Sequence, residues 1–148
     1  MRSQTVIAGF NAGAVIGYTV LFAVAFWLLF YHLDSHLLWG DEAETAVLAK
    51  NVVQFGVPRT FDGTNYILLH GTVDETPGHI WIWSPWMQNY LAASSFILFG
   101  PTTWAARAPF AFIGWCSVLL LAAIAAAACV APARKAALVD PMNALREE

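Results

Sequence analysis

Charged side chains are scarce in this sequence. Lys, Arg, Asp and Glu together make up 11% of the 148 residues, against about 25% in an ordinary soluble domain. So few charges cannot form the polar shell that a soluble domain of this size needs, and 59% of the residues are hydrophobic. This composition excludes an ordinary water-soluble fold and predicts a membrane protein with the lipid bilayer as a partner.

Basic residues and cysteines are also few. Seven basic residues against ten acidic ones give a net charge of -3, which is not the basic footprint of a nucleic-acid-binding protein. No nucleic-acid partner is therefore expected. Cys116 and Cys129 lie in one apolar run, roughly 20 Å apart on a helix that rises about 1.5 Å per residue. They cannot bridge each other, and we expect them to be small packing residues.

Two uncharged apolar runs, residues 12–31 and residues 110–130, each have about the 20 residues that a helix needs to cross a ~30 Å hydrocarbon core. The first run ends in bulky residues such as Trp27 and Tyr31, which favours an uncleaved anchor over a signal peptide. The second is expected to end before Pro132, and its alanine-rich half favours contact with other transmembrane helices. The predicted fold class is an all-α membrane protein with two transmembrane helices.

The flanking charges predict how the chain is oriented. Arg2 precedes the first run, Arg134 and Lys135 follow the second, and residues 32–109 between the two runs are acidic overall. By the positive-inside rule the intervening loop faces outward from the cell (inner) membrane and both termini are cytoplasmic. Arg107, just before the second run, is the exception to this rule. The predicted cytoplasmic segments are residues 1–11 and 131–148.

The outward loop contains a first predicted helix near residues 42–55, in WGDEAETAVLAKNVVQFGVP. Asp41 is its expected N-cap, with Glu44 three residues later as in a capping box, and Gly56 ends it. Residues 58–78 that follow are polar and Gly-rich, and we expect them to be irregular. One face of the helix carries Thr45, Leu48, Ala49, Val52 and Phe55.

A second loop helix is predicted near residues 85–99. Ser84 and Pro85 form a good N-cap and first-turn pair, and Gly100 ends the helix. At roughly 22 Å it is too short to span, and its tryptophans favour a position at the membrane interface. The alternative extends this helix back to Ile80 as a third spanning helix.

Three acidic residues, Asp41, Glu42 and Glu44, stand shortly after the first apolar run. A carboxylate there could act as a general base. In the alternative interpretation, Asp41 and Glu44 only form a capping box and Glu42 is favoured in the first turn by the helix dipole. The spacing alone favours the capping interpretation.

Four histidines, His32, His36, His70 and His79, invite a metal-site hypothesis. None of them has the spacing of a specific motif such as H-E-x-x-H. We therefore expect no metal and no other cofactor. Several tryptophans of the loop could stack on a sugar ring or a lipid head, although an interfacial aromatic belt is their commoner role.

Four features follow one another in a recognisable order: a spanning helix, the Asp-Glu pair of WGDEAETAVLAKNVVQFGVP, the segment SPWMQNYLAASSFILFG, and TTWAARAPFAF leading into the second span. From Trp39 to about Leu120 the chain resembles the beginning of family 39 glycosyltransferases. These are GT-C membrane enzymes that include protein O-mannosyltransferases and aminoarabinose transferases. The resemblance implies a GT-C-like N-terminal fragment whose first outward loop carries two helices parallel to the membrane.

The resemblance also implies an activity. Enzymes of this family transfer a sugar from a polyprenyl-phosphate-linked donor to a hydroxyl or amine on the outer face, with inversion. The position of the proposed catalytic base falls on Asp41, with Glu42 beside it as a supporting carboxylate.

The sequence departs from the family in two ways. Aminoarabinose transferases carry an Arg where this chain has Glu44 and a Lys where it has Ser84, and those basic groups are linked to the donor phosphate. The substrate-binding substitutes predicted here are Lys50, Arg59 and Arg107. Family members also have many more spanning helices, so the sequence is interpreted as a truncated glycosyltransferase that is too short to be active alone.

Residues 132–148, PARKAALVDPMNALREE, resemble the cytoplasmic C-terminus of macrolide-exporter-type ABC transporter permeases. The alternative is an ordinary basic tail followed by a short helix capped at Asp140 and Pro141. The competing functional hypothesis is therefore a non-catalytic membrane-anchored remnant, or a fusion with a permease end. Sequencing the DNA downstream of codon 148 would reveal whether further apolar helices follow.

Overall fold

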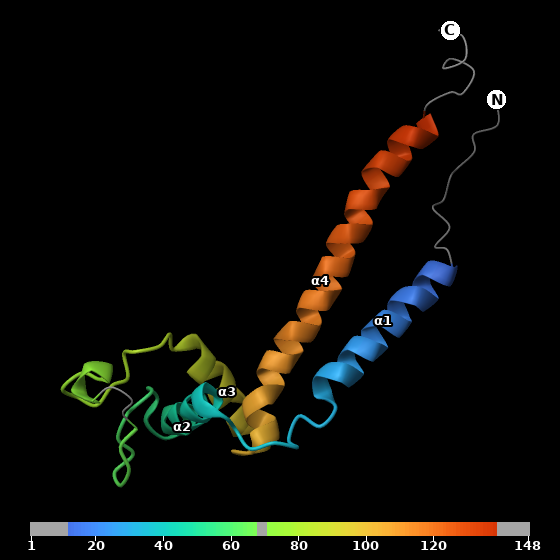
Figure 1. Ribbon diagram of the computed structural model, residues 1–148. Helices are drawn as coiled ribbons and strands as arrows, with labels where there is room; N and C mark the ends of the chain where they lie inside the picture. Colours follow the sequence, from blue (N-terminus) through green and yellow to red (C-terminus); the bar gives the residue numbers. More distant parts are fainter. Residues whose placement is uncertain (1–11, 68–70, 139–148) are drawn as a thin grey trace. The chain divides into compact units, whose positions relative to one another are not determined.

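The computed structural model describes residues 12–67 and 71–138 (Figure 1). This part of the chain contains four α-helices, one 3-10 turn and no strand, so the all-helical prediction is confirmed. Residues 1–28 and 114–148 form one compact unit, and residues 29–113 form a second. The elements are α1 (Ala12–Phe30), α2 (Gly40–Phe55), the 3-10 turn (Gly71–Asp74), α3 (Met87–Phe99) and α4 (Thr103–Leu138).

Two helices are long and apolar enough to cross a membrane, α1 over 19 residues and α4 over Thr103–Val130. The most apolar stretch of each has no residue buried within the structure, so lipid or other helices must cover these side chains. This fits a membrane protein. The helix containing the second span does not end before Pro132 as predicted, because α4 continues to Leu138. A proline inside a helix removes one hydrogen bond without having to end the helix.

Within the first unit, Trp115 of α4 contacts α1. Its indole Nε1 donates a hydrogen bond to the carbonyl oxygen of Phe22 at 3.2 Å, and its ring meets that of Phe26 edge to face at 5.7 Å. The polar atom of a large apolar side chain is thereby satisfied inside the helix pair. The short helix predicted at Asp140 lies outside the described residues.

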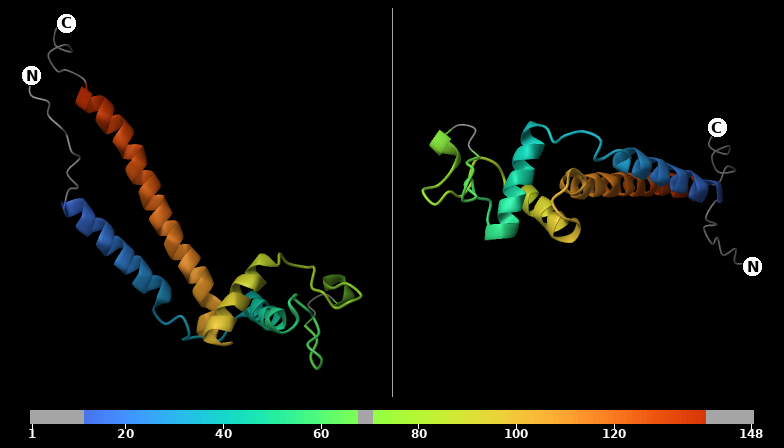
Figure 2. Two further views of the ribbon diagram at one scale, coloured as in Figure 1. Left: turned by 180° about the vertical axis from the view of Figure 1, so that it is seen from behind. Right: turned by 90° about the horizontal axis from the view of Figure 1, so that it is seen from below.

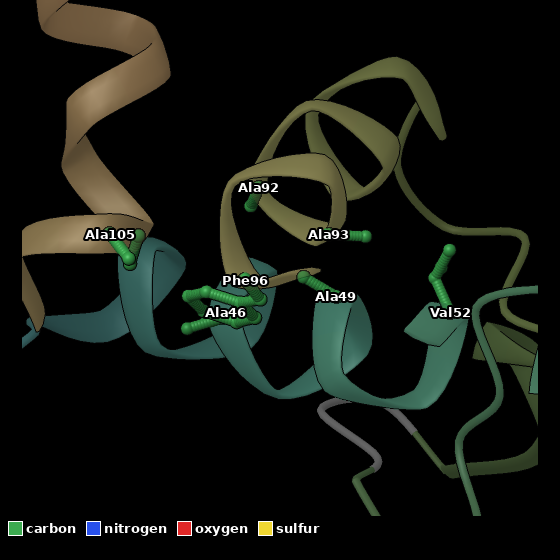
Figure 3. Close-up of a cluster of buried hydrophobic side chains, with 8 residues drawn as sticks. Ala46, Ala49, Val52, Ala92, Ala93, Phe96 and Ala105 are labelled. Atoms are coloured by element: carbon green, nitrogen blue, oxygen red, sulfur yellow. The ribbon is translucent and has the colours of Figure 1, made fainter. Parts of the chain in front are cut away.

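Within the second unit, α2 and α3 lie side by side, as the views of Figure 2 also show. Alanines dominate the contact between the two helices (Figure 3). Because alanine side chains are short, the helix backbones can approach closely. The core comprises Ala46, Ala49 and Val52 of α2, Ala92, Ala93 and Phe96 of α3, and Ala105 and Ala106 of α4. Of the predicted apolar face of α2, Thr45, Leu48, Ala49 and Val52 are buried.

Enlarging one of these alanines should destabilise the second unit. Ala49 and Ala92 are both fully buried, so Ala49→Leu has to push α2 and α3 apart at a cost of about 1–3 kcal/mol. Val53→Leu, on the exposed side of the same helix, serves as the control. Denaturant unfolding in detergent should show a lower midpoint for Ala49→Leu alone, and equal midpoints would contradict the close packing.

The N-caps of both loop helices differ from the prediction. Helix α2 begins at Gly40, its N-cap is Trp39, and the Glu42 carboxylate accepts a hydrogen bond from the Trp39 backbone N–H at 3.4 Å. Asp41 therefore lies inside the first turn and does not cap the helix. The predicted end is confirmed, because Gly56 adopts a φ of 78° and its N–H donates to the Val52 carbonyl.

Helix α3 begins at Met87 with Trp86 as its N-cap, so the predicted cap at Ser84 and Pro85 is wrong. The hydroxyl of Ser84 is engaged elsewhere, since it donates to Glu44 Oε1 at 3.3 Å. The alternative spanning helix from Ile80 is also wrong, because the 13 residues of α3 reach only about 20 Å. Its interfacial position stays a prediction.

The segment between α2 and α3 is irregular, as expected, where the structure describes it. Isolated bridges join Arg59 to Ile80 and Glu75 to Trp81. The side chain of Asn51 on α2 donates to the Arg59 carbonyl at 2.6 Å. Since Asn51 is buried, this bond fixes the start of the segment against the α2–α3 core.

Candidate functional site

A cavity of about 500 Å³ lies within the second unit, at the start of α2. Its lining contains apolar and polar side chains. The apolar lining residues are Leu29, Leu33, Leu38, Ala106, Phe110 and Ala111. The polar lining residues are Asp41, Glu42, Thr45, Gln88 and Arg107. The cavity therefore brings the Asp41–Glu42 pair together with Arg107. These residues were predicted as site residues from two separate parts of the sequence.

The local structure explains why these side chains meet. Asp41 and Thr45 are four residues apart on α2, so they lie on one face, with Glu42 beside them in the first turn. Arg107 comes from the second turn of α4 and Gln88 from the first turn of α3. The i, i+4 spacing could have identified Thr45 from the sequence. No sequence signal pointed to Gln88.

Arg107 makes the densest set of contacts at the site. Its Nε and Nη2 donate to the carboxylate of Glu42, with a shortest distance of 2.7 Å from Nη2 to Oε2. Nη1 donates to the carbonyls of Leu33 at 2.8 Å and His36 at 3.0 Å, and Nη2 donates to Leu37 at 3.2 Å. A guanidinium has five N–H donors, and here all five have protein acceptors. Arg107 has no donor left for a ligand without giving up one of these bonds.

Glu42 is held in its charged form by this contact. The hydrogen bond from Arg107 keeps the pKa of the Glu42 carboxyl below its usual range, and the Trp39 N–H lowers it further. Glu42 is therefore a fixed anion at neutral pH.

The lowered pKa of Glu42 predicts how the second unit responds to acid. A carboxyl whose pKa is lower folded than unfolded contributes stability that is present above the unfolded value of about 4.5 and is lost as the pH falls through the folded pKa. We expect acid to weaken the Glu42–Arg107 contact below about pH 4.5. Glu42→Gln should flatten that part of the stability curve, measured by thermal unfolding between pH 3 and 7. An unchanged pH dependence would contradict the stabilising role of Glu42.

Glu44, two residues further along α2, behaves in the opposite way. Burial raises the pKa of its carboxyl, and the negative charges of Asp41 and Asp74 raise it further, against a lowering effect of the hydrogen bond from Ser84. Ser84 Oγ also accepts hydrogen bonds from Trp81 Nε1 at 2.7 Å and Gln88 Nε2 at 3.5 Å. The two positions at which the sequence departs from aminoarabinose transferases, Glu44 and Ser84, are thus in direct contact.

Asp41 is exposed and lines the cavity. Its carboxylate has no hydrogen-bond partner within residues 12–67 and 71–138. It can therefore accept hydrogen bonds or a proton from a ligand in the cavity.

A second cavity, of about 240 Å³, shares Leu38 with the first. Lys50 lines it together with Thr102 and Thr103 at the start of α4. Thr102 Oγ1 accepts a hydrogen bond from the Ala105 N–H at 3.2 Å. The ammonium of Lys50 is exposed and has no partner in the part of the chain that the structure describes. Lys50 of α2 thus shares this cavity with the first turn of α4, where backbone N–H groups favour anions.

Arg59 lines neither of these two cavities. Its guanidinium lies over the Phe55 ring, 5.0 Å from the centroid, and Nη2 donates to the Gly78 carbonyl at 3.5 Å. Of the three predicted substrate-binding cations, the structure therefore places Arg107 in the first cavity, Lys50 in the second and Arg59 in neither.

The histidines do not gather around a common point in the described ranges, where no group of three His, Cys, Asp or Glu side chains could hold a metal ion. His79 instead pairs with Glu75, with 3.0 Å between Nδ1 and Oε2. His70 lies outside the described residues.

Comparisons with protein-family models, with curated proteins and with solved structures gave no match. The resemblance to family 39 glycosyltransferases therefore depends on the sequence motifs alone. The position of Asp41 in the cavity does not depend on that resemblance.

Proposed function

We propose that the chain forms the N-terminal, acceptor-side part of an inverting membrane glycosyltransferase of family 39 type, with Asp41 as the general base. The observation that supports this most is the position of Asp41. Its carboxylate, which has no hydrogen-bond partner among the described residues, lines a cavity of about 500 Å³ together with apolar side chains such as Leu38 and Phe110. In this proposal the loop faces outward from the inner membrane and both termini are cytoplasmic.

The proposed reaction is a single displacement. The acceptor hydroxyl or amine attacks the anomeric carbon of the sugar from the face opposite the polyprenyl phosphate, while Asp41 takes the acceptor's proton. The bond between the anomeric carbon and the phosphate oxygen breaks, and the polyprenyl phosphate leaves with the electron pair. One displacement inverts the configuration at the sugar carbon.

Glu42 and Arg107 support the base without touching the reacting atoms. Because all five Arg107 donors bind Glu42 or backbone carbonyls, we assign Arg107 to positioning instead of donor binding. It holds the first turn of α2 against residues 33–37, and this fixes where Asp41 stands.

The donor phosphate is assigned to Lys50 and the N-terminus of α4. Lys50 has a free ammonium, and a helix N-terminus supplies backbone N–H groups and a positive dipole end. Since the cavities of Lys50 and Asp41 share Leu38, the donor phosphate and the acceptor would bind in neighbouring cavities.

Lys50→Ala tests the donor assignment. Loss of a charge-assisted hydrogen bond to phosphate should raise the KM for the polyprenyl-phosphate sugar about 10-fold to 100-fold, with a smaller effect on kcat. Transfer is measured with residues 1–148 replacing the matching part of a family 39 enzyme, since the chain is not expected to be active alone. Arg59→Ala is the matched control and should leave KM unchanged. A chimera that folds and inserts but transfers no sugar would instead favour the non-catalytic remnant.

A further inference from the structure

The charge of the 500 Å³ cavity is unbalanced. Among the lining residues that the structure describes, Arg107 is the only cation, and the carboxylate of Glu42 contacts it at 2.7 Å. This pair neutralises itself and leaves no guanidinium donor free. Within the same described ranges, no cation pairs with Asp41.

A second carboxylate, Glu44, follows Asp41 by three residues on α2. The negative charge of Asp41 raises the pKa of Glu44, and Glu44 is connected to the cavity through Ser84, which accepts a hydrogen bond from the cavity residue Gln88. No salt bridge joins a cation to Glu44 in the described part of the chain. The charge of Asp41 is therefore the one that a cationic ligand in the cavity would meet.

Six of the eleven lining residues are apolar, among them Leu33, Leu38 and Phe110. The volume of about 500 Å³ falls within the range of small-molecule sites, about 300–1,000 Å³. A ligand that complements both the Asp41 carboxylate and these apolar side chains has a cationic head and an apolar chain.

We propose that this cavity binds a protonated amine carried on an apolar chain, with the ammonium at Asp41 and the chain along Leu33, Leu38 and Phe110. The proposal concerns binding alone, so it does not depend on the proposed transfer. Where both hold, Asp41 takes one proton from the ammonium, the neutral amine then attacks the anomeric carbon as the polyprenyl phosphate leaves, and the product is a protonated secondary amine.

Other head groups fit less well. A phosphate would lie beside the carboxylates of Asp41 and Glu42 while the five donors of Arg107 are already engaged, and like charges at close range repel. An alcohol can donate a hydrogen bond to Asp41 but forgoes the stronger charge-assisted bond of an ammonium. The charge pattern therefore favours an amine over an alcohol, and an alcohol over a phosphate.

The test uses the full chain in nanodiscs of zwitterionic lipid. The probe is a twelve-carbon primary amine with a photoactivatable diazirine in its chain, and mass spectrometry maps the labelled residues. Labelling is expected at the apolar lining residues Leu33, Leu38 and Phe110. Dodecylamine should compete best, dodecanol less well and dodecyl phosphate least.

Asp41→Asn and Asp62→Asn remove the same charge, so a comparison of the two makes the result specific to the cavity. Asp41→Asn should reduce labelling of the cavity about tenfold, and Asp41→Glu should retain most of it. Asp62→Asn is the control, because Asp62 lies outside the cavity and its replacement can still accept the backbone hydrogen bonds of Thr64 and Asn65.

Three results would overturn the inference. They are labelling that maps away from the cavity, dodecyl phosphate as the best competitor, or equal losses in Asp41→Asn and Asp62→Asn. Because the readout is binding, none of them depends on whether the chimera transfers sugar.

Discussion

Asp41→Asn should reduce sugar transfer by the chimera about 10²-fold to 10⁴-fold, the range typical for loss of a general base. An asparagine amide cannot take up the acceptor's proton near neutral pH. Membrane insertion and helix content should stay unchanged, because the substitution keeps the size and shape of the side chain. Transfer is measured with a radiolabelled polyprenyl-phosphate sugar and helix content by circular dichroism.

The structure sharpens this experiment because Asp41 is not the N-cap of α2. If Asp41 capped the helix, Asp41→Ala would lose about 1 kcal/mol of stability while Asp41→Asn would not. With Trp39 as the N-cap, both variants should fold equally well and both should be inactive. Retained activity in Asp41→Asn would refute the base assignment. A fold lost only in Asp41→Ala would show instead that the Asp41 side chain has a structural role as a hydrogen-bond acceptor, which asparagine can also fill.

Much of the architecture could be predicted from the sequence because it depends on local composition. The two spanning helices follow from long uncharged runs, and the buried face of α2 follows from apolar residues at helical spacing. That Asp41 and Glu42 line the same cavity could also be expected, because neighbouring residues in one helical turn stay together in any fold.

Two features that the sequence did not explain depend on contacts between residues far apart in the chain. Ser84 looked like an N-cap because its local sequence is suitable, yet its hydroxyl bonds Glu44 on another helix. Arg107 looked misplaced beside an outer membrane surface, yet its partners Leu33 and Glu42 lie more than sixty residues away. Local patterns carry no information about such partners.

Arg107 has the largest structural role that the cavity reveals, and its replacement should have a correspondingly large effect. The Arg107 side chain is only 18% exposed, whereas that of Glu42 is 49% exposed. Arg107→Ala removes the Arg107 donors from the Glu42 carboxylate and from the carbonyls of Leu33, His36 and Leu37, and leaves Glu42 only the longer bond from the Trp39 N–H. Loss of one partner of an ion pair with one half-exposed member should destabilise the second unit by about 2–4 kcal/mol.

Arg107→Lys separates charge from geometry. Lysine keeps the positive charge but has three donors on one nitrogen and no planar fork, so it cannot bind Glu42 and three carbonyls together. We expect amide hydrogen exchange over residues 33–42 to become faster in both variants, with Arg107→Ala the more affected. Transfer should fall with it, because Asp41 shares the first turn of α2 with Glu42. Arg59→Ala, which loses one 3.5 Å bond, should leave exchange in this segment unchanged. If Arg107→Lys matched the wild type in exchange and transfer, charge alone would suffice and the fork of hydrogen bonds would not be what positions Asp41.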